Sequence, residues 1–267
     1  MEKFKQIGTL KAPLFKTNNI ENLVETECLF GEKFLVKKEL DEWSYGVLCT
    51  DGYEGWIHTK NLTDFSFNNY KVMKRSSNIY KKPNDKSVII QRLTFGCQIN
   101  VIEIKKKWAK VSLNNQNHEQ IGFVPSIHIS KHTSETKNWI KYCNNMIGIP
   151  YVWGGRSSDG IDCSALLQLS FQAVGINIPR NTKEQLRYMI LSKNFKRLKI
   201  NFFRRKIYEK GIIIFWPGHV GIISRQNILL HSNANMMIVC EEKIHEALFR
   251  LKSENILPTS AFRLNIL

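Results

Sequence analysis

The sequence predicts two small all-β barrels followed by a larger α+β domain. Three observations lead to this prediction. The first half contains a repeat, its short segments alternate apolar and polar residues as strands do, and the later part changes to helical spacing before strand-like runs return. Helices followed by a run of antiparallel strands are typical of an α+β domain.

The repeat consists of two successive units. In each unit a glycine precedes a tryptophan by the same spacing, and a second glycine with an aromatic neighbour comes before a short apolar turn. Short alternating strands separated by Gly, Asn and Asp turns indicate a small barrel. We therefore expect tandem barrels over residues 1–69 and 70–131. The repeated residues are Gly31, Trp43, Gly55 and Trp56 in the first unit and Gly96, Trp108, Gly122 and Phe123 in the second.

The α+β domain is expected over residues 132–267. Apolar residues recur at helical spacing between Ser134, a capping residue, and Gly148, which predicts a first helix. A second helix begins near Cys163 and is apolar almost all round, so it should be buried. The apolar runs of the last third read as strands.

Composition indicates a folded protein with an unusual charge. Hydrophobic residues make up 43% and charged residues 23%, which excludes the disordered and fibrous classes. The formal net charge of +16 suggests an anionic partner. However, the lysines are scattered, and the densest cluster, residues 193–210, carries no nucleic-acid signature. A functional basic patch and biased residue usage both stay open, and we expect no nucleic-acid partner.

The N-terminus lacks the apolar core of a signal peptide, and no window has the roughly 18 apolar residues of a membrane span. Six cysteines are too few for a disulfide scaffold in a chain of 267 residues. We therefore expect a monomeric cytoplasmic protein with free thiols and no membrane span.

Cys163 is the strongest candidate for a catalytic nucleophile. It follows a Gly-Gly turn and an aspartate, at the first turn of the second helix, where unpaired backbone amides stabilise a thiolate. Its own amide would point to the place where an oxyanion forms. The alternative is a structural cysteine of a core helix, and the other five cysteines look like ordinary core or surface residues.

Amide cleavage also needs a group that protonates the leaving amine. His219 and His231 lie on two strand-like segments joined by a turn near residues 225–227, so they come within reach if the register agrees. His219 would be the general base and His231 its orienting partner. Each histidine alone could be a satisfied polar residue of a strand. One cysteine and two histidines lack a fourth zinc ligand, so we expect no metal and no cofactor.

The chain resembles the NlpC/p60 cysteine peptidases. The motifs YVWGG, DCSALLQLSF, GINIPRNTKEQ, GHVGII and LLHS occur in that order after residue 134. The units ahead of them resemble the bacterial SH3-like repeats of the dipeptidyl-peptidase VI branch, closely in the first unit and loosely in the second. The resemblance implies a papain-like α+β fold. It also implies a hydrolase that cleaves the bond between γ-D-glutamate and the diamino acid of murein peptides with a free N-terminal L-alanine.

The same resemblance implies roles for further residues. Tyr151 would lend its hydroxyl to the oxyanion hole or hold the scissile carbonyl, or it would pack as an aromatic residue beside Trp153. Asp162 would face the ammonium group of the substrate, or cap the helix. Asn181 stands where the family usually has aspartate, so a charge-assisted contact becomes a neutral one. The candidates for substrate binding are Asp162, Ser164, Trp153, Arg180, Asn181 and Thr182, with Glu25, Glu32 and Tyr53 of the first barrel reading the free N-terminus.

Two alternative functions stay open. The same thiol scaffold could belong to an amidase or acyltransferase with another γ-glutamyl acceptor. The barrels could instead bind the cell wall or an anionic polymer beside a catalytically reduced domain.

Overall fold

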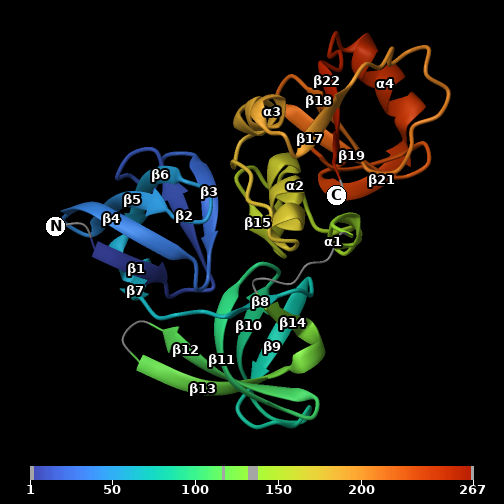
Figure 1. Ribbon diagram of the computed structural model, residues 1–267. Helices are drawn as coiled ribbons and strands as arrows, with labels where there is room; N and C mark the ends of the chain where they lie inside the picture. The colour runs from blue at the N-terminus through green and yellow to red at the C-terminus, as the bar shows by residue number, and fades with distance from the viewer. Residues whose placement is uncertain (1–2, 116–117, 132–137, 266–267) are drawn as a thin grey trace. The chain divides into compact units, whose positions relative to one another are not determined.

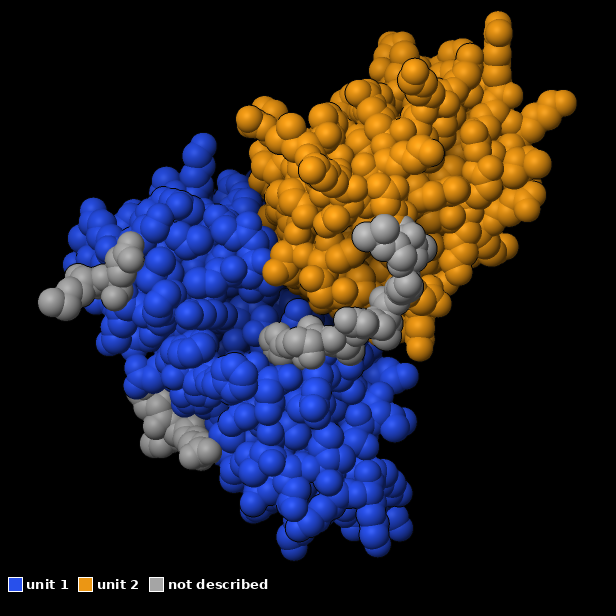
Figure 2. Space-filling model, in the orientation of Figure 1, with its two compact units in different colours: residues 1–135, 153–158 blue, residues 136–152, 159–267 orange. Residues whose placement is uncertain are grey.

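A computed structural model describes residues 3–115, 118–131 and 138–265 (Figure 1). The chain divides into two compact units, coloured separately in Figure 2. Both expected barrels fall in one unit, so the division into three domains at 1–69, 70–131 and 132–267 stays a prediction. Unit 1 comprises residues 1–135 and 153–158, and unit 2 comprises residues 136–152 and 159–267.

Unit 1 contains two seven-stranded sheets with the same strand order. The first runs β3-β2-β6-β5-β4-β1-β7 and the second runs β10-β9-β13-β12-β11-β8-β14, so each strand of the second corresponds to the strand seven positions earlier. The predicted all-β repeat is therefore confirmed as a repeat of topology. The first set is β1 (Lys3–Ile7), β2 (Lys11–Phe15), β3 (Val24–Leu29), β4 (Lys33–Leu40), β5 (Trp43–Leu48), β6 (Tyr53–His58) and β7 (Leu62–Asp64). The second is β8 (Tyr70–Val72), β9 (Ser76–Tyr80), β10 (Ile89–Thr94), β11 (Gln98–Lys105), β12 (Trp108–Asn115), β13 (His118–Pro125) and β14 (Ile129–Lys131). Short 3-10 turns, Thr59–Asn61 and Ser126–His128, precede β7 and β14.

Alternation along the strands builds the core of the first barrel. Phe34 and Val36 on β4 and Leu48 on β5 are buried, and they belong to one apolar cluster with Leu14 and Ile57. The residues between them on the same strands are more exposed. This period of two is what places one face of a strand in a core.

Residues 153–158, with the short strand β15 (Arg156–Ser157), belong to unit 1 because they bind the first barrel. The guanidinium of the fully buried Arg156 donates to both carboxylate oxygens of Glu32, at 2.9 and 3.0 Å, and to the carbonyl of Glu27. Gly154 has a φ of +74°, and a Cβ there would lie 2.8 Å from the carbonyl oxygen of Val24, so only glycine fits. The expectation that Glu32 binds the N-terminus of the substrate is wrong, because its buried carboxylate is paired with Arg156.

The described residues of unit 2 form a six-stranded sheet, four helices and one short strand outside that sheet, β16. The sheet runs β17-β22-β18-β19-β20-β21, and α2 lies against β19 and β20. The predicted α+β arrangement is confirmed. The strands are β16 (Gly160–Ile161), β17 (Phe195–Leu198), β18 (Ile212–Trp216), β19 (His219–Arg225), β20 (Ile228–Asn233), β21 (Ile238–Lys243) and β22 (Ser260–Leu264), and the helices are α1 (Ile140–Asn144), α2 (Cys163–Gln172), α3 (Thr182–Leu191) and α4 (Ile244–Ser253).

The helices follow the expected pattern with one difference in length. Every residue of α2 is buried, as its apolar surface predicts. The first helix, α1, is shorter than expected, because it ends at Asn144 and turns continue to Gly148, whose φ is +83°. Ser134, its expected cap, lies outside the described residues. No helix in the described ranges has the length and apolar character to cross a membrane.

Candidate active site

The first turn of α2 positions Cys163. Asp162 is the N-cap residue, and its Oδ1 accepts a hydrogen bond from the amide of Ala165 at 2.8 Å. The Cys163 Sγ lies 4.0 Å from the hydroxyl of Thr182, the first residue of α3, and 4.0 Å from the carbonyl oxygen of Gly218. Gly218 directly precedes His219 at the start of β19. The fold thus brings together three segments that are far apart in the sequence.

The hairpin β19–β20 brings the two predicted histidines together. Asn227 adopts a φ of +59° in its turn, and Ile222 pairs with Leu230 on the two strands. As a result His219 Nε2 and His231 Nδ1 are 2.8 Å apart. The expected reach between the two rings is therefore confirmed.

Glu242 extends this pair, and the sequence argument missed it. Its Oε1 lies 2.9 Å from His231 Nε2 and accepts a hydrogen bond from Arg250 at 2.7 Å. Glu242 is on β21, which pairs with β20. Only the pairing of these strands identifies it, because nothing in the local sequence separates Glu242 from its neighbour Glu241.

The carboxylate of Glu242 determines where the protons lie. A carboxylate only accepts, so the neutral tautomer of His231 that fits this contact carries its proton on Nε2 and accepts at Nδ1. His219 must then donate from Nε2, which leaves its Nδ1 unprotonated. This tautomer gives His219 a free lone pair that can take a proton, as a general base requires.

Burial sets the protonation of the thiol and the imidazole. It raises the pKa of Cys163 to about 11, and the negative charge of Asp162 adds to the rise. Burial also lowers the pKa of His219 to about 3, and a charge on His231 would lower it further. The expected resting thiolate is therefore wrong, because loss of water around the sulfur outweighs the partial charge of the helix N-terminus. At neutral pH the site holds a thiol and a neutral imidazole.

Asp162 belongs to a buried polar cluster beside the nucleophile. Arg180 donates to Oδ2 of Asp162 at 2.6 Å and to its Oδ1 at 3.0 Å, and Ser164 donates to the same Oδ1. Arg180 also donates to Ser164 at 2.8 Å. Of the two readings of Asp162, helix capping is the one that the structure confirms. A carboxylate already paired with a guanidinium offers less charge to a substrate ammonium.

Two more predicted residues lie near this cluster. Burial raises the pKa of the Tyr151 phenol to about 12, with smaller contributions from Cys163 and Asp162. Asn181 is the N-cap residue of α3, directly before Thr182. Their roles stay predictions. Within the described ranges, no group of three or more His, Cys, Asp and Glu side chains is placed to hold a metal ion.

The remaining candidates belong to unit 1. Tyr53 donates from its hydroxyl to Glu25 at 2.8 Å, and Trp153 is 59% exposed. A tyrosine hydroxyl beside a carboxylate can bind an ammonium group. The part that Glu25, Tyr53 and Trp153 take in substrate binding stays a prediction.

The fold and the site define a cysteine-type peptidase. Its thiol begins a buried helix, and its imidazole is oriented by a second histidine and a carboxylate. Comparison with family models agrees, since residues 148–252 match the NlpC/P60 family and residues 14–62 match the bacterial dipeptidyl-peptidase Sh3 domain. The chain therefore carries an NlpC/P60 peptidase domain preceded by a dipeptidyl-peptidase SH3 domain.

Individual relatives extend the likeness over most of the chain. A γ-D-glutamyl-L-lysine dipeptidyl-peptidase from Bacillus subtilis (strain 168) is 28% identical over 62% of this chain and 58% of that protein, which is less than two thirds of its length. Dipeptidyl-peptidase 6 from Lysinibacillus sphaericus is 26% identical over 84% of this chain and 85% of that protein. A crystal structure of an NlpC/P60 family protein from Bacillus cereus ATCC 10987 has the same fold, with a TM-score of 0.76, 17% identity, and coverage of 97% of this chain and 98% of that one.

Proposed function

We propose that this peptidase hydrolyses the bond between γ-D-glutamate and the diamino acid in murein peptides that begin with a free L-alanine. The observation that carries the proposal is the hydrogen-bonded row from His219 through His231 to Glu242, together with the Cys163 Sγ, which lies 4.0 Å from the carbonyl oxygen of Gly218, the residue before His219. The name of the Bacillus subtilis relative, a γ-D-glutamyl-L-lysine dipeptidyl-peptidase, supports the choice of a γ-D-glutamyl peptide.

In the proposed reaction, Cys163 attacks as its proton leaves. His219 Nδ1 takes the proton while the sulfur forms a bond to the γ-carbonyl carbon, and the electron pair of the carbonyl moves to its oxygen. The backbone amide of Cys163 would bind that oxyanion. When the carbon–nitrogen bond breaks, the protonated His219 gives its proton to the leaving amine of the diamino acid, and a thioester remains.

Water completes the cycle. The oxygen of a water molecule attacks the carbonyl carbon of the thioester while His219 takes a proton from that water. The carbon–sulfur bond then breaks. The departing sulfur recovers the proton, so the free enzyme again holds a thiol and a neutral imidazole. His231 and Glu242 act through His219 throughout, because they keep its Nδ1 available.

Release of the diamino acid from synthetic tripeptides tests the proposal. L-Ala-γ-D-Glu-diaminopimelate and L-Ala-γ-D-Glu-L-Lys are incubated with the full chain, and the amine products are separated by chromatography. We expect release from at least one tripeptide, loss of release in Cys163→Ala, and little release when the alanine is N-acetylated. Absence of release by folded wild-type protein from both peptides would reject the substrate. Products that carry the acyl group on added hydroxylamine, without free acid, would indicate an acyltransferase instead.

A further inference from the structure

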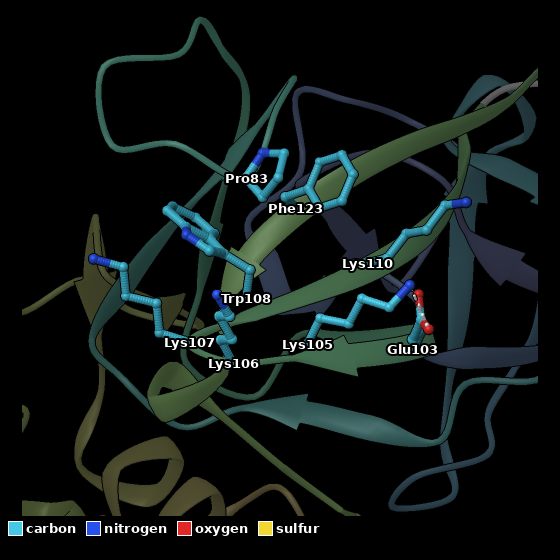
Figure 3. A pocket seen from close by; sticks show the side chains of 8 residues that line it. All are labelled: Pro83, Glu103, Lys105, Lys106, Lys107, Trp108, Lys110 and Phe123. Carbon is cyan, nitrogen blue, oxygen red and sulfur yellow. Dashed lines mark ion pairs between the residues drawn. The ribbon is translucent and has the colours of Figure 1, made fainter.

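The second barrel carries a hollow that the peptidase site does not use. Its volume is about 580 Å³, and Pro83, Trp108 and Phe123 form its apolar surface (Figure 3). Tyr80 packs edge-on against Trp108, with ring centroids 5.4 Å apart and an interplanar angle of 83°, which holds the indole in place. The volume lies within the range of small-ligand sites, about 300–1,000 Å³.

Positive charge surrounds this apolar surface. Lys105 ends β11, Lys106 and Lys107 form the turn to β12, and all three are exposed. Lys110 follows on β12 and also lines the hollow. Figure 3 shows Lys107 extending to one side of Trp108, and Lys105 and Lys110 on the other. Among the described residues that line the hollow, the acidic one is Glu103, which is paired with Lys105 at 3.0 Å. We call these four lysines, with Pro83, Trp108 and Phe123, the Trp108 groove.

A comparison with the first barrel shows that the positive charge before Trp108 is specific to the second barrel. Its Trp43 is packed edge-on by Phe15 in the same way, with centroids 5.7 Å apart and an interplanar angle of 82°. The turn before Trp43 begins with a left-handed residue just as the turn before Trp108 does, since Asp41 has a φ of 50° and Lys106 one of 53°. In the first barrel, however, the two turn residues are Asp41 and Glu42, and Leu40 at the end of β4 corresponds to Lys105.

The two turns therefore share a backbone and an aromatic support but differ in charge. Two acidic residues of the first barrel correspond to two lysines of the second. A general bias toward lysine across the chain does not explain why the sign of the charge is reversed in only one of two matching turns. This comparison favours a functional basic patch, which the composition alone left open.

We propose that the Trp108 groove binds an acidic glycan. The apolar face of a sugar ring would lie against Trp108, and carboxylates on the ring would meet the surrounding lysines. Lysine supplies a mobile point charge, which suits carboxylates at variable positions along a polymer. Proteins that bind single-stranded nucleic acid stack successive bases on several aromatic side chains along a basic channel. The Trp108 groove instead has one apolar hollow with charge at its rim.

The site lies outside the peptidase machinery, so it can be tested with catalysis as a check of folding. Binding of the full chain to polygalacturonate is measured by biolayer interferometry, with neutral dextran, poly-L-glutamate and a single-stranded oligothymidylate as the other probes. We expect binding to polygalacturonate that weakens as salt rises, and tighter binding to it than to the other three probes.

The matched variant replaces the basic turn by the residues of the first barrel. Lys106→Asp with Lys107→Glu copies a sequence that this turn conformation already accommodates, and we expect it to weaken polygalacturonate binding by about tenfold or more. The control, Lys193→Asp with Lys196→Glu, makes the same change of charge at exposed positions of unit 2. The activity of both variants toward any tripeptide that the wild type cleaves, or their circular dichroism if it cleaves none, reports folding.

Three results would overturn the proposal. Equal weakening in both charge variants would mean that net charge alone drives binding. Dextran binding as tight as polygalacturonate binding would remove the role of the lysines. Tighter binding of the oligothymidylate or of poly-L-glutamate would assign the groove to another class of polymer.

Discussion

At the scale of single residues, a row of hydrogen bonds governs the chemistry of the site. His219, His231 and Glu242 are joined by contacts of 2.8 and 2.9 Å, and Arg250 donates to the same Oε1 of Glu242 that faces His231. Burial disfavours charge on Glu242, but the hydrogen bonds from His231 and Arg250 outweigh this and lower its pKa. A carboxylate that stays ionised keeps His231, and through it His219, in one tautomer.

Replacement of Glu242 by glutamine should lower kcat by about 10- to 100-fold, by analogy with the loss found when the carboxylate that orients a metal-ligating histidine is removed. KM should change little, because Glu242 is argued to act on the imidazole and not on the substrate. Glu241→Gln is the control, since Glu241 binds Ser224 and Arg225 instead. Equal kinetics in the two variants would contradict the role of Glu242, as would a rise in KM with kcat unchanged.

The protonation of Cys163 predicts its reactivity without substrate. Because burial raises its pKa to about 11 and the residue is only 7% exposed, iodoacetamide at pH 7 should modify Cys163 more slowly than the exposed Cys49. Peptide mass spectrometry at successive times gives the order. If Cys163 is modified first, the site holds a thiolate after all.

The lowered pKa of His219 predicts the acid side of the rate profile. The neutral imidazole is the active form, and a pKa near 3 means that it binds a proton only at low pH. The kcat/KM of the wild type should therefore stay high as pH falls below 6.5, the value of a free imidazole. Rates are compared only where circular dichroism shows folded protein. An acid midpoint at or above 6.5 would contradict this prediction.

At the scale of elements, the sequence allowed the main features of unit 2 to be predicted. The start of α2, the hairpin β19–β20 and the order of Cys163, His219 and His231 all follow from local patterns and motif spacing. Glu242 could not be predicted, because its contact depends on how β20 pairs with β21. The expectation of a resting thiolate at Cys163 was wrong for a related reason. The sequence indicates a helix N-terminus, but not how completely the fold removes water from the sulfur.

The contacts of residues 153–158 with the first barrel could not be predicted from the sequence either. Its main contact joins Arg156 to Glu32, which lies more than a hundred residues earlier. Both side chains are buried, so water could not take the place of a missing partner. Loss of one partner from such a pair leaves an uncompensated buried charge.

Replacement of Glu32 by glutamine should therefore lower the free energy of unfolding of unit 1 by about 3–5 kcal/mol. Urea denaturation followed by circular dichroism measures the change. The control is Asp64→Asn, which removes one partner of the exposed pair with Lys5 and should have little effect. In the double variant Glu32→Met with Arg156→Met, part of the lost stability should return. Similar midpoints for Glu32→Gln and Asp64→Asn would show that the buried pair contributes little.

At the scale of the whole molecule, the chain reuses one barrel topology with different surfaces. The two sheets of unit 1 share their strand order and an edge-on aromatic pair, which the repeat of glycine and tryptophan allowed us to expect in outline. The surfaces differ, since one barrel holds Arg156 through Glu32 and the other has the basic Trp108 groove. At the position of Glu32, the second barrel has the buried Cys97.

The place of residues 153–158 in unit 1 bears on any attempt to shorten the protein. A fragment that starts at residue 136 would keep Arg156 but lose Glu27 and Glu32. Its guanidinium, which is buried and paired in the full chain, would then have lost the carboxylate and the carbonyl that bind it. Truncation at the apparent start of the peptidase would then damage the very stretch that leads into the nucleophile. Anyone who wants the smallest working piece should retain the first barrel.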